Sequence, residues 1–175
     1  LGANPMKLGL DLRGGVRFVL EVDMAKALEQ RLATAAQDAR RVLRGEQIPV
    51  QSLRTTANGM VLTFASTDDR SRAQNVLQSQ MGMDFVLRPF ADTEGAALEM
   101  TYTDAKLQEI NEYAVGQNLT TLRNRINAFG VAEALVQSQG TNRIVVELPG
   151  VQDAAEAKRV LGRTVNLDFP FVNEA

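Results

Sequence analysis

Residues 8–23 read Leu-Gly-Leu-Asp-Leu-Arg-Gly-Gly-Val-Arg-Phe-Val-Leu-Glu-Val-Asp, and the expected fold is organised around this stretch. From Val16 to Val22 the side chains alternate at a period of two, which predicts a strand with one well-buried face. Gly14 and Gly15 precede the strand, and paired glycines allow a positive φ or a close backbone approach. Asp11 and Arg13 are expected at the strand mouth, where a hairpin or bulge entry with a solvated ion pair would account for them.

The composition is that of a soluble globular protein with one substantial core or two small ones. The chain has 175 residues, of which 45% are hydrophobic and 23% charged. Its 19 Lys and Arg residues against 21 Asp and Glu residues argue against nucleic-acid binding, which needs a basic face. No segment approaches the roughly 18 apolar residues that would span a bilayer. Because the sequence starts at Leu1 without an initiator Met or signal peptide, we expect it to be part of a longer polypeptide.

The predicted elements follow one order twice: strand, helix, strand, strand, helix, strand. Helices are expected over 24–44, 70–80, 103–128 and 153–161, and strands over 16–22, 50–56, 60–64, 83–90, 98–102, 134–138, 143–148 and 164–169. This order predicts an α+β fold of two ferredoxin-like units, with antiparallel sheets and helices on one face. The expected division is 1–95 and 96–175. Alternatively, a segment of about 24–97 is inserted, and the second sheet shares the strand 16–22.

No catalytic, metal or cofactor site is predicted. The chain has no Cys and no His, which excludes a thiol nucleophile, a thiolate metal site and the commonest general base. Asp68 and Asp69 stand at a predicted helix N-terminus, where carboxylates usually cap the helix and complement its dipole. Residues 9–15 lack the spacing of a phosphate-binding loop, and a strand follows them where such a loop needs a helix.

The end of the long helix is the second informative stretch. Polar residues decorate it, namely Arg123, Asn124, Arg125 and Asn127. The arginines are interpreted as partners of the helix dipole and of nearby acids. Leu122, Ile126 and Phe129 continue one apolar stripe and are predicted to be core residues, and Gly130 ends the helix. Further on, Pro149 and Gly150 are expected to turn the chain.

Two long motifs resemble the SecD family of bacterial protein-export subunits. The first is Asp11-Leu12-Arg13-Gly14-Gly15, followed by the hydrophobic strand. The second spans 122–133 and 142–151 in the same order as in that family, and it includes Gly130, Pro149 and Gly150. Residues 24–97 look like the extra segment of longer, Gram-negative-type members. Phe169-Pro170-Phe171 departs from the family pattern, which usually has Arg after the Phe, so the exit from this region is expected to differ.

The resemblance implies a fragment of the first periplasmic loop, on the outer side of the bacterial inner membrane. Its implied role is non-catalytic help with preprotein translocation and release, driven by the proton gradient through membrane spans elsewhere in the parent protein. The implied partners are SecF, the SecYEG channel, YajC and unfolded preproteins, and no nucleic acid. The resemblance also implies that a mobile head follows residue 169. Asp11 and Arg13 would then help to fix the angle between membrane and domain.

A second function class remains open from the architecture alone. Small-molecule regulatory domains of the amino-acid-binding kind also use paired strand-helix-strand-strand-helix-strand units. Such domains hold their ligands near glycine-rich turns, and Gly9, Gly14 and Gly15 are compatible with that use. A thermal-shift screen against amino acids separates the two classes.

Overall fold

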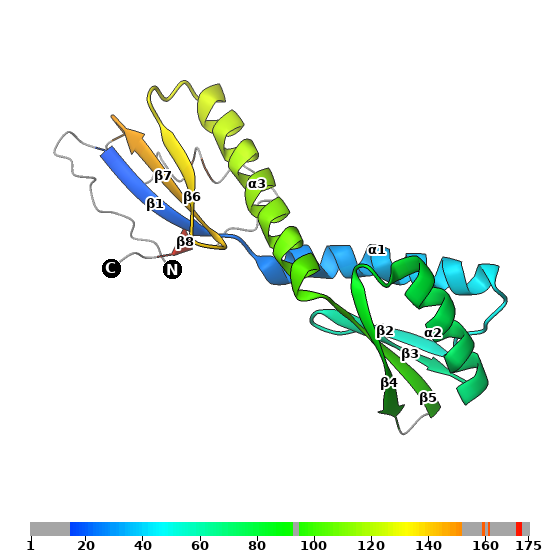
Figure 1. Cartoon of the computed structure of the whole chain (residues 1–175). Coiled ribbons are helices and arrows are strands. Elements are labelled where there is room, and N and C mark those ends of the chain that lie inside the picture. The colour runs from blue at the N-terminus through cyan, green and yellow to red at the C-terminus, as the bar shows by residue number, and fades with distance from the viewer. Residues whose placement is uncertain (1–14, 93–94, 152–158, 160, 162–170, 173–175) are drawn as a thin grey trace. The chain divides into compact units, whose positions relative to one another are not determined.

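The computed structural model of the chain describes residues 15–92, 95–151, 159, 161 and 171–172. The chain divides into two compact units. Unit 1 contains residues up to Met24 together with those from Asn111 onward, and unit 2 is Ala25–Ile110. Each unit has a four-stranded antiparallel sheet (Figure 1). The predicted α+β class with two antiparallel sheets is therefore confirmed.

Unit 1 is a strand-helix-strand arrangement with another strand inserted between its two strands. Its elements are β1 (Gly15–Glu21), α3 (Asp104–Ala128, with residues from 111 in this unit), β6 (Leu135–Gln139), β7 (Arg143–Pro149) and β8 (Phe171–Val172). The strand order is β6-β7-β1-β8, so β7 separates β1 from β6. This order is compatible with the ferredoxin-like plan, in which a split strand-helix-strand is the repeating motif.

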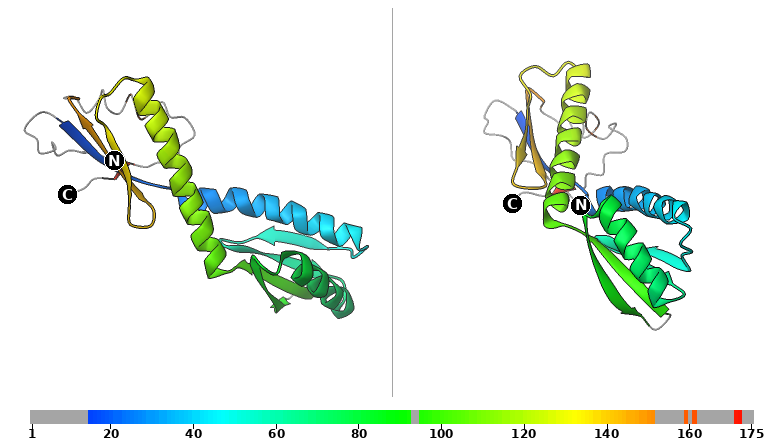
Figure 2. Two further views of the ribbon diagram at one scale, coloured as in Figure 1. Left: turned by 45° about the horizontal axis from the view of Figure 1, so that its top comes forward. Right: turned by 45° about the vertical axis from the view of Figure 1, so that its right-hand side comes forward.

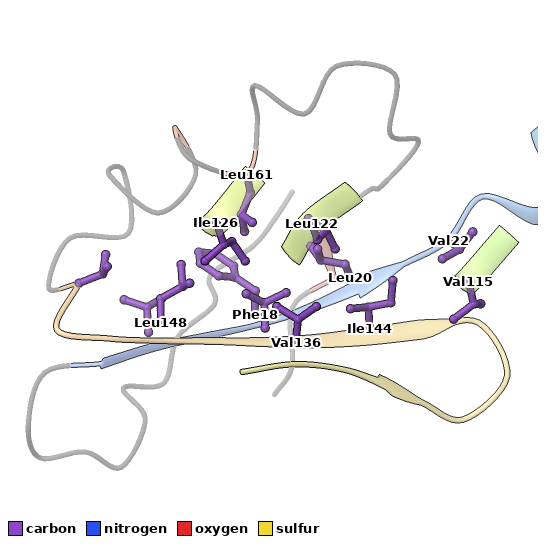
Figure 3. Packing of buried hydrophobic residues seen from close by; sticks show 13 residues of the cluster. Phe18, Leu20, Val22, Val115, Leu122, Ile126, Val136, Ile144, Leu148 and Leu161 are labelled. Atoms are coloured by element: carbon purple, nitrogen blue, oxygen red, sulfur yellow. The ribbon is translucent and has the colours of Figure 1, made fainter. Parts of the chain in front are cut away.

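The core of unit 1 lies between its sheet and α3. Phe18, Ile144 and Leu148 point from β1 and β7 toward the helix (Figure 3). Leu122 and Ile126 of α3 pack against them. These five side chains are at most 2% exposed. Full burial of such a side chain stabilises a fold by about 1.5–3 kcal/mol. The alternation of buried residues in β1 is thus the physical basis of the predicted strand.

Unit 2 contains the same split motif with a different starting point. Its elements are α1 (Met24–Gly45), β2 (Ser52–Thr55), β3 (Gly59–Phe64), α2 (Thr67–Met81), β4 (Phe85–Asp92) and β5 (Gly95–Tyr102). The strand order is β2-β3-β5-β4, so β5 separates β3 from β4, and both helices lie on one side of the sheet (Figures 1 and 2). The fourth strand, β2, precedes the split motif here, whereas β8 follows it in unit 1.

Local signals set the boundaries of several elements in unit 2. A hairpin with Asn58-Gly59 in its turn joins β2 to β3, and the Thr56 amide donates to the Gly59 carbonyl at 2.8 Å. A side chain at Gly59 would collide with the backbone of Met100 in β5, so only glycine fits this close approach. Helix α2 is capped by Ser66, whose hydroxyl accepts from the Asp69 amide at 3.1 Å. The cap is therefore Ser66, and the acids expected at this helix N-terminus, Asp68 and Asp69, lie in the first turn.

The pairing of two strands bears on the expected division of the chain. The strand 16–22 was expected either to open the first sheet or to be shared by the second, and β1 pairs with β7 and β8 as in the second alternative. The strand 98–102 was expected in the unit 96–175, but β5 pairs with β3 and β4. Alternating hydrophobicity predicts a strand but not its partner, and the pairing of β1 with β7 joins distant parts of the chain. Most of the predicted helix 153–161 and all of the strand 164–169 lie outside the described residues.

Candidate functional site

The two sequence motifs meet at one end of the unit 1 sheet. Gly15, the described residue of the first motif, is the register partner of Pro149, which belongs to the second. A Cβ added at Gly15 would lie 3.5 Å from the Pro149 Cα, an ordinary contact. Gly15 also lacks a positive φ, so neither of the two expected reasons for glycine, a positive φ or a close backbone approach, applies at this position. Asp11, Leu12, Arg13 and Gly14 lie outside the described residues.

The Pro149-Gly150 pair turns the chain at the end of β7. Gly150 has a φ of +84°, and the Val151 amide donates to the Leu148 carbonyl at 3.4 Å. Proline in the second and glycine in the third position of such a turn are typical of type II. The predicted turn is therefore present, and Gly150 is the residue of this pair that needs the freedom of glycine.

Side-chain polar contacts also join β1 to β7, the other central strand of this sheet, and to Asn142, which precedes β7. Arg17 and Glu147 are register partners, and Nε of Arg17 lies 3.5 Å from Oε1 of Glu147. At the other end of the sheet, the Asn142 side-chain amide donates to Oε1 of Glu21 at 3.3 Å. Both pairs are partly exposed, so each contributes at most about 1 kcal/mol. They position the strands and show no sign of a reactive centre.

Gly130 ends α3 through a defined capping geometry. Its φ is +73°, its amide donates to Asn127 O at 3.0 Å, and the Val131 amide donates to Ile126 O at 3.4 Å. These two bonds form a Schellman motif, in which glycine in the left-handed conformation satisfies the last carbonyls of a helix. Val131 also packs against the core cluster that contains Ile126. The left-handed conformation of this helix cap thus explains the glycine at position 130.

The polar residues at the end of α3 have different surroundings. Arg123 Nη2 donates to the Val136 carbonyl of β6 at 2.9 Å. The guanidinium of Arg125 lies 5.9 Å from the centre of the Phe129 ring, within the range of a cation–π contact. Asn124 and Asn127 are exposed. The expected pairing of Arg123 with an acid or with the carbonyls that end α3 is replaced by a bond to a sheet carbonyl.

Phe129 does not belong to the core. Its side chain is 42% exposed, whereas Ile126 is 1% exposed, as predicted. Phe129 follows Ala128, the last residue of α3, and its amide still donates to the Arg125 carbonyl at 3.2 Å, but its side chain is not part of the core cluster that contains Leu122 and Ile126. The prediction of a buried Phe129 is therefore wrong, and the ring is available at the surface beside Gly130.

Sequence reasoning missed one residue that fixes α3 to the sheet. The Asn111 side-chain amide donates to the Thr141 carbonyl, in the β6–β7 turn, at 2.7 Å. Together with the Arg123 bond it holds α3 to the β6–β7 hairpin at two places. A polar residue at the edge of an apolar stripe is common in any exposed helix, so no pattern in the sequence distinguishes Asn111.

Two cavities are lined by described residues of unit 2, and neither is lined by a residue of the two motifs. The larger has about 480 Å³ and is lined by Arg40, Arg44, Gln47, Ile48, Pro49 and Val50. The other has about 390 Å³ and lies between α1 and the β2–β3 turn, where Leu28 and Thr56 line it. Among the described residues, no group of carboxylates could hold a metal ion, and no helix is long and apolar enough to cross a membrane.

One titratable group of unit 2 is perturbed by its surroundings. Burial raises the pKa of Tyr102 above its ordinary value of 10.0, Arg31 opposes this rise, and Asp84 adds to it. The ring stacks on Phe85 with a centroid distance of 4.4 Å. A buried tyrosine in a core stack is a structural feature, and its raised pKa keeps the phenol protonated.

Comparisons with known proteins agree with the motifs. The family described as the N-terminal part of the P1 domain of protein translocase subunit SecDF matches residues 115–174, and the SecD/SecF GG motif matches residues 1–26. The chain is 48% identical over 174 residues to protein translocase subunit SecD of Pseudomonas aeruginosa, which covers 99% of the chain and 28% of the relative. It is 43% identical to SecD of Haemophilus influenzae over 99% of the chain and 28% of the relative. It is 46% identical to SecD of Escherichia coli K12 over 98% of the chain and 27% of the relative.

The chain thus spans less than a third of the length of these relatives, and it matches that part almost from end to end. Both motifs from which the resemblance was inferred fall within the matched regions. Over nearly its whole length, the chain is therefore similar to one part of the SecD protein translocase subunits.

Proposed function

We propose that this chain is a non-catalytic periplasmic module of a translocase subunit. In this role it handles unfolded preproteins as they leave the SecYEG channel, together with SecF and YajC. The observation that carries the proposal is the similarity over nearly the whole chain to SecD proteins. The energy source would be the proton gradient, acting through membrane spans of the longer parent protein.

The geometry of unit 1 supports a mechanical role. The first motif leads directly into β1, the central strand that pairs with both β7 and β8. The Pro149-Gly150 turn lies beside the entry to this strand, since Gly15 and Pro149 are register partners. A displacement applied at residue 15 would therefore act on the middle of the sheet. Such a role needs stiffness, and the fully buried core of Phe18, Leu20 and Ile144 supplies it.

The experiment that tests this proposal combines two measurements on one double variant, Asp11→Ala with Arg13→Ala. The isolated chain should keep its melting temperature to within a few degrees, because an exposed ion pair contributes only about 0–1 kcal/mol. Cells whose sole full-length copy carries the same change should accumulate unprocessed preprotein. Normal export with a stably expressed variant would remove the functional claim for this motif.

The amino-acid-binding alternative has a separate test. A thermal-shift screen of the isolated chain against amino acids should give no stabilisation. A specific ligand with micromolar affinity would favour a small-molecule regulatory domain instead. The cavity beside Arg40 and Arg44 is the place to look for such a ligand by mutation, because it is the larger of the two described cavities.

A further inference from the structure

The outer edge of β6 has little protection against pairing with another strand. In unit 1 β6 ends the sheet, and no described strand pairs with its outer side. Its residues are Leu-Val-Gln-Ser-Gln, without a charge or a proline. Sheet edges are commonly protected by charged side chains, Pro or bulges. The edge strands of unit 2 have such residues, since β4 contains Arg88 and Pro89 and β2 contains Arg54.

The register shows which backbone groups of β6 point outward. The Val22 amide donates to Asn142 O at 2.8 Å, so the neighbouring pair Glu21–Arg143 is of the non-hydrogen-bonded type. Arg143 must then direct its amide and carbonyl toward β6. Because hydrogen-bonded and non-hydrogen-bonded pairs alternate along an antiparallel ladder, Val136 and Ser138 direct theirs away from β7. The two residues thus present backbone donors and acceptors at the free edge.

The bond from Arg123 agrees with this assignment. Its guanidinium reaches the Val136 carbonyl at 2.9 Å, which requires that carbonyl to be accessible from outside the β6–β7 ladder. Arg123 is itself exposed, so water can replace its bond to Val136 when a competing donor arrives. No bond to the outward amide or carbonyl of Ser138 is found among the described residues. Of the outward backbone groups of β6, the Val136 carbonyl therefore has a hydrogen bond from Arg123, while the amide and carbonyl of Ser138 can accept a new partner.

We propose that the outer edge of β6 binds an extended, uncharged polypeptide segment as an additional strand. This inference rests on the proposed function, because it assigns the unfolded preprotein a place on the chain. Main-chain hydrogen bonds supply affinity without demanding a particular sequence, which suits a surface that meets many different chains. Leu135, the first residue of β6, is 40% exposed and offers apolar contact to a side chain of the segment, and Phe129, 42% exposed, lies six residues earlier in the chain.

The size of the edge favours a passing chain over a second copy of this protein. Five residues of strand are about 17 Å long. One short strand pair contributes only part of the roughly 1,200 Å² that a stable protein–protein interface buries. The short edge therefore suits brief occupation by a chain in transit, which needs to be released again.

The test uses a fluorescein-labelled short peptide of alternating threonine and valine, and anisotropy with the 175-residue chain. Binding should be saturable, and it should disappear when alternate peptide amides are N-methylated, because the side chains remain while the main-chain donors are lost. Ser138→Pro removes an outward amide without touching the ladder to β7, so it should weaken binding by about tenfold or more. Ser138→Ala is the matched control, which keeps the amide and should bind like the parent.

Four results would overturn the inference. The N-methylated peptide could bind as well as the unmodified one, or Ser138→Pro could bind like Ser138→Ala while both melt like the parent. A concentration-dependent dimer that Ser138→Pro abolishes would assign the edge to a second copy. Arg123→Met frees the Val136 carbonyl and should leave peptide binding equal or tighter. Weaker binding by a normally folded Arg123→Met would show that the arginine itself holds the peptide.

Cells carrying full-length Ser138→Pro separate this inference from the proposed function. If the edge receives preprotein, their export should be slower than in cells carrying Ser138→Ala at equal expression. Normal export in Ser138→Pro cells, together with defective export in cells with the Asp11→Ala and Arg13→Ala change, would refute the edge and retain the translocation role. Normal export in both would refute the two proposals together.

Discussion

Replacing Gly116 of α3 and Gly130 just after α3 by alanine should change the stability of unit 1 in opposite directions. Gly116 lies in the helix interior, and Gly130 follows the helix with a φ of +73°. An added Cβ meets nothing within 4 Å at either position, so steric space does not decide the outcome. What differs is the backbone conformation that alanine must adopt. The pair therefore isolates the contribution of the Schellman motif to the stability of unit 1.

The magnitudes follow from the two conformations. Gly116→Ala should stabilise by about 0.5–1 kcal/mol, since glycine is a poor residue in a helix interior. Gly130→Ala should destabilise by about 1–2 kcal/mol, the cost of the left-handed region for a residue with a Cβ. The free energies of unfolding of the two variants should therefore differ by about 1.5–3 kcal/mol. Gly130→Asn should recover part of the loss, because asparagine tolerates this conformation.

The assay is urea unfolding followed by circular dichroism, with amide exchange as a unit-specific check. Exchange of the β7 amides reports unit 1, and exchange of the β3 amides reports unit 2. Both substitutions should change the exchange rates of the β7 amides and leave those of the β3 amides unchanged. A stabilised Gly130→Ala variant, or the same sign for both variants, would refute the role of Gly130 as the residue that ends α3.

Three further predictions concern substitutions at other positions. Ile126→Ala should lower the free energy of unfolding by about 2–5 kcal/mol, and Phe129→Ala by at most about 1 kcal/mol, because only Ile126 is buried. Equal urea midpoints for the two variants would contradict this difference in burial. Gly150→Ala should destabilise the chain by about 1–2 kcal/mol, whereas Gly15→Ala should change its stability by less than about 1 kcal/mol, because only Gly150 has a positive φ. A larger drop in melting temperature for Gly15→Ala than for Gly150→Ala would contradict this prediction. Burial raises the pKa of Tyr102, so the unfolded chain loses the phenolic proton at a lower pH than the folded chain, and the free energy of unfolding should fall as the pH rises above 10.0. Tyr102→Phe should remove this part of the pH dependence. If the variant has the same slope of stability against pH as the parent, Tyr102 is not its source.

The sequence predicted the elements of the fold better than their partners. The alternation over 16–22 and the stripe containing Leu122 and Ile126 identify a strand and a helix, because burial on one face imposes the period. The same alternation suits either sheet, so the assignment of β1 and β5 depends on pairing across long separations that no local pattern encodes. Phe129 was misplaced because the helical period was continued one residue beyond Ala128.

The candidate site was predictable as motifs and not as geometry. Glycine and proline signals identified Gly130 and the Pro149-Gly150 turn, since these residues have strong local preferences. The meeting of Gly15 with Pro149 and the bond from Arg123 to Val136 are tertiary contacts between distant segments. The free edge of β6 likewise follows from strand order, which appears only once the sheet is assembled.

Photo-crosslinking in cells tests the central claim most directly, that this chain contacts preproteins during export. A photoreactive residue is placed in the full-length protein at Leu135, Phe129 or Met83, which are 40%, 42% and 94% exposed, while export of a preprotein is stalled. Adducts with the stalled preprotein are expected from Leu135 and Phe129, with fewer from Met83 and none after the preprotein is released. Stable expression of all three proteins without any preprotein adduct would contradict the account.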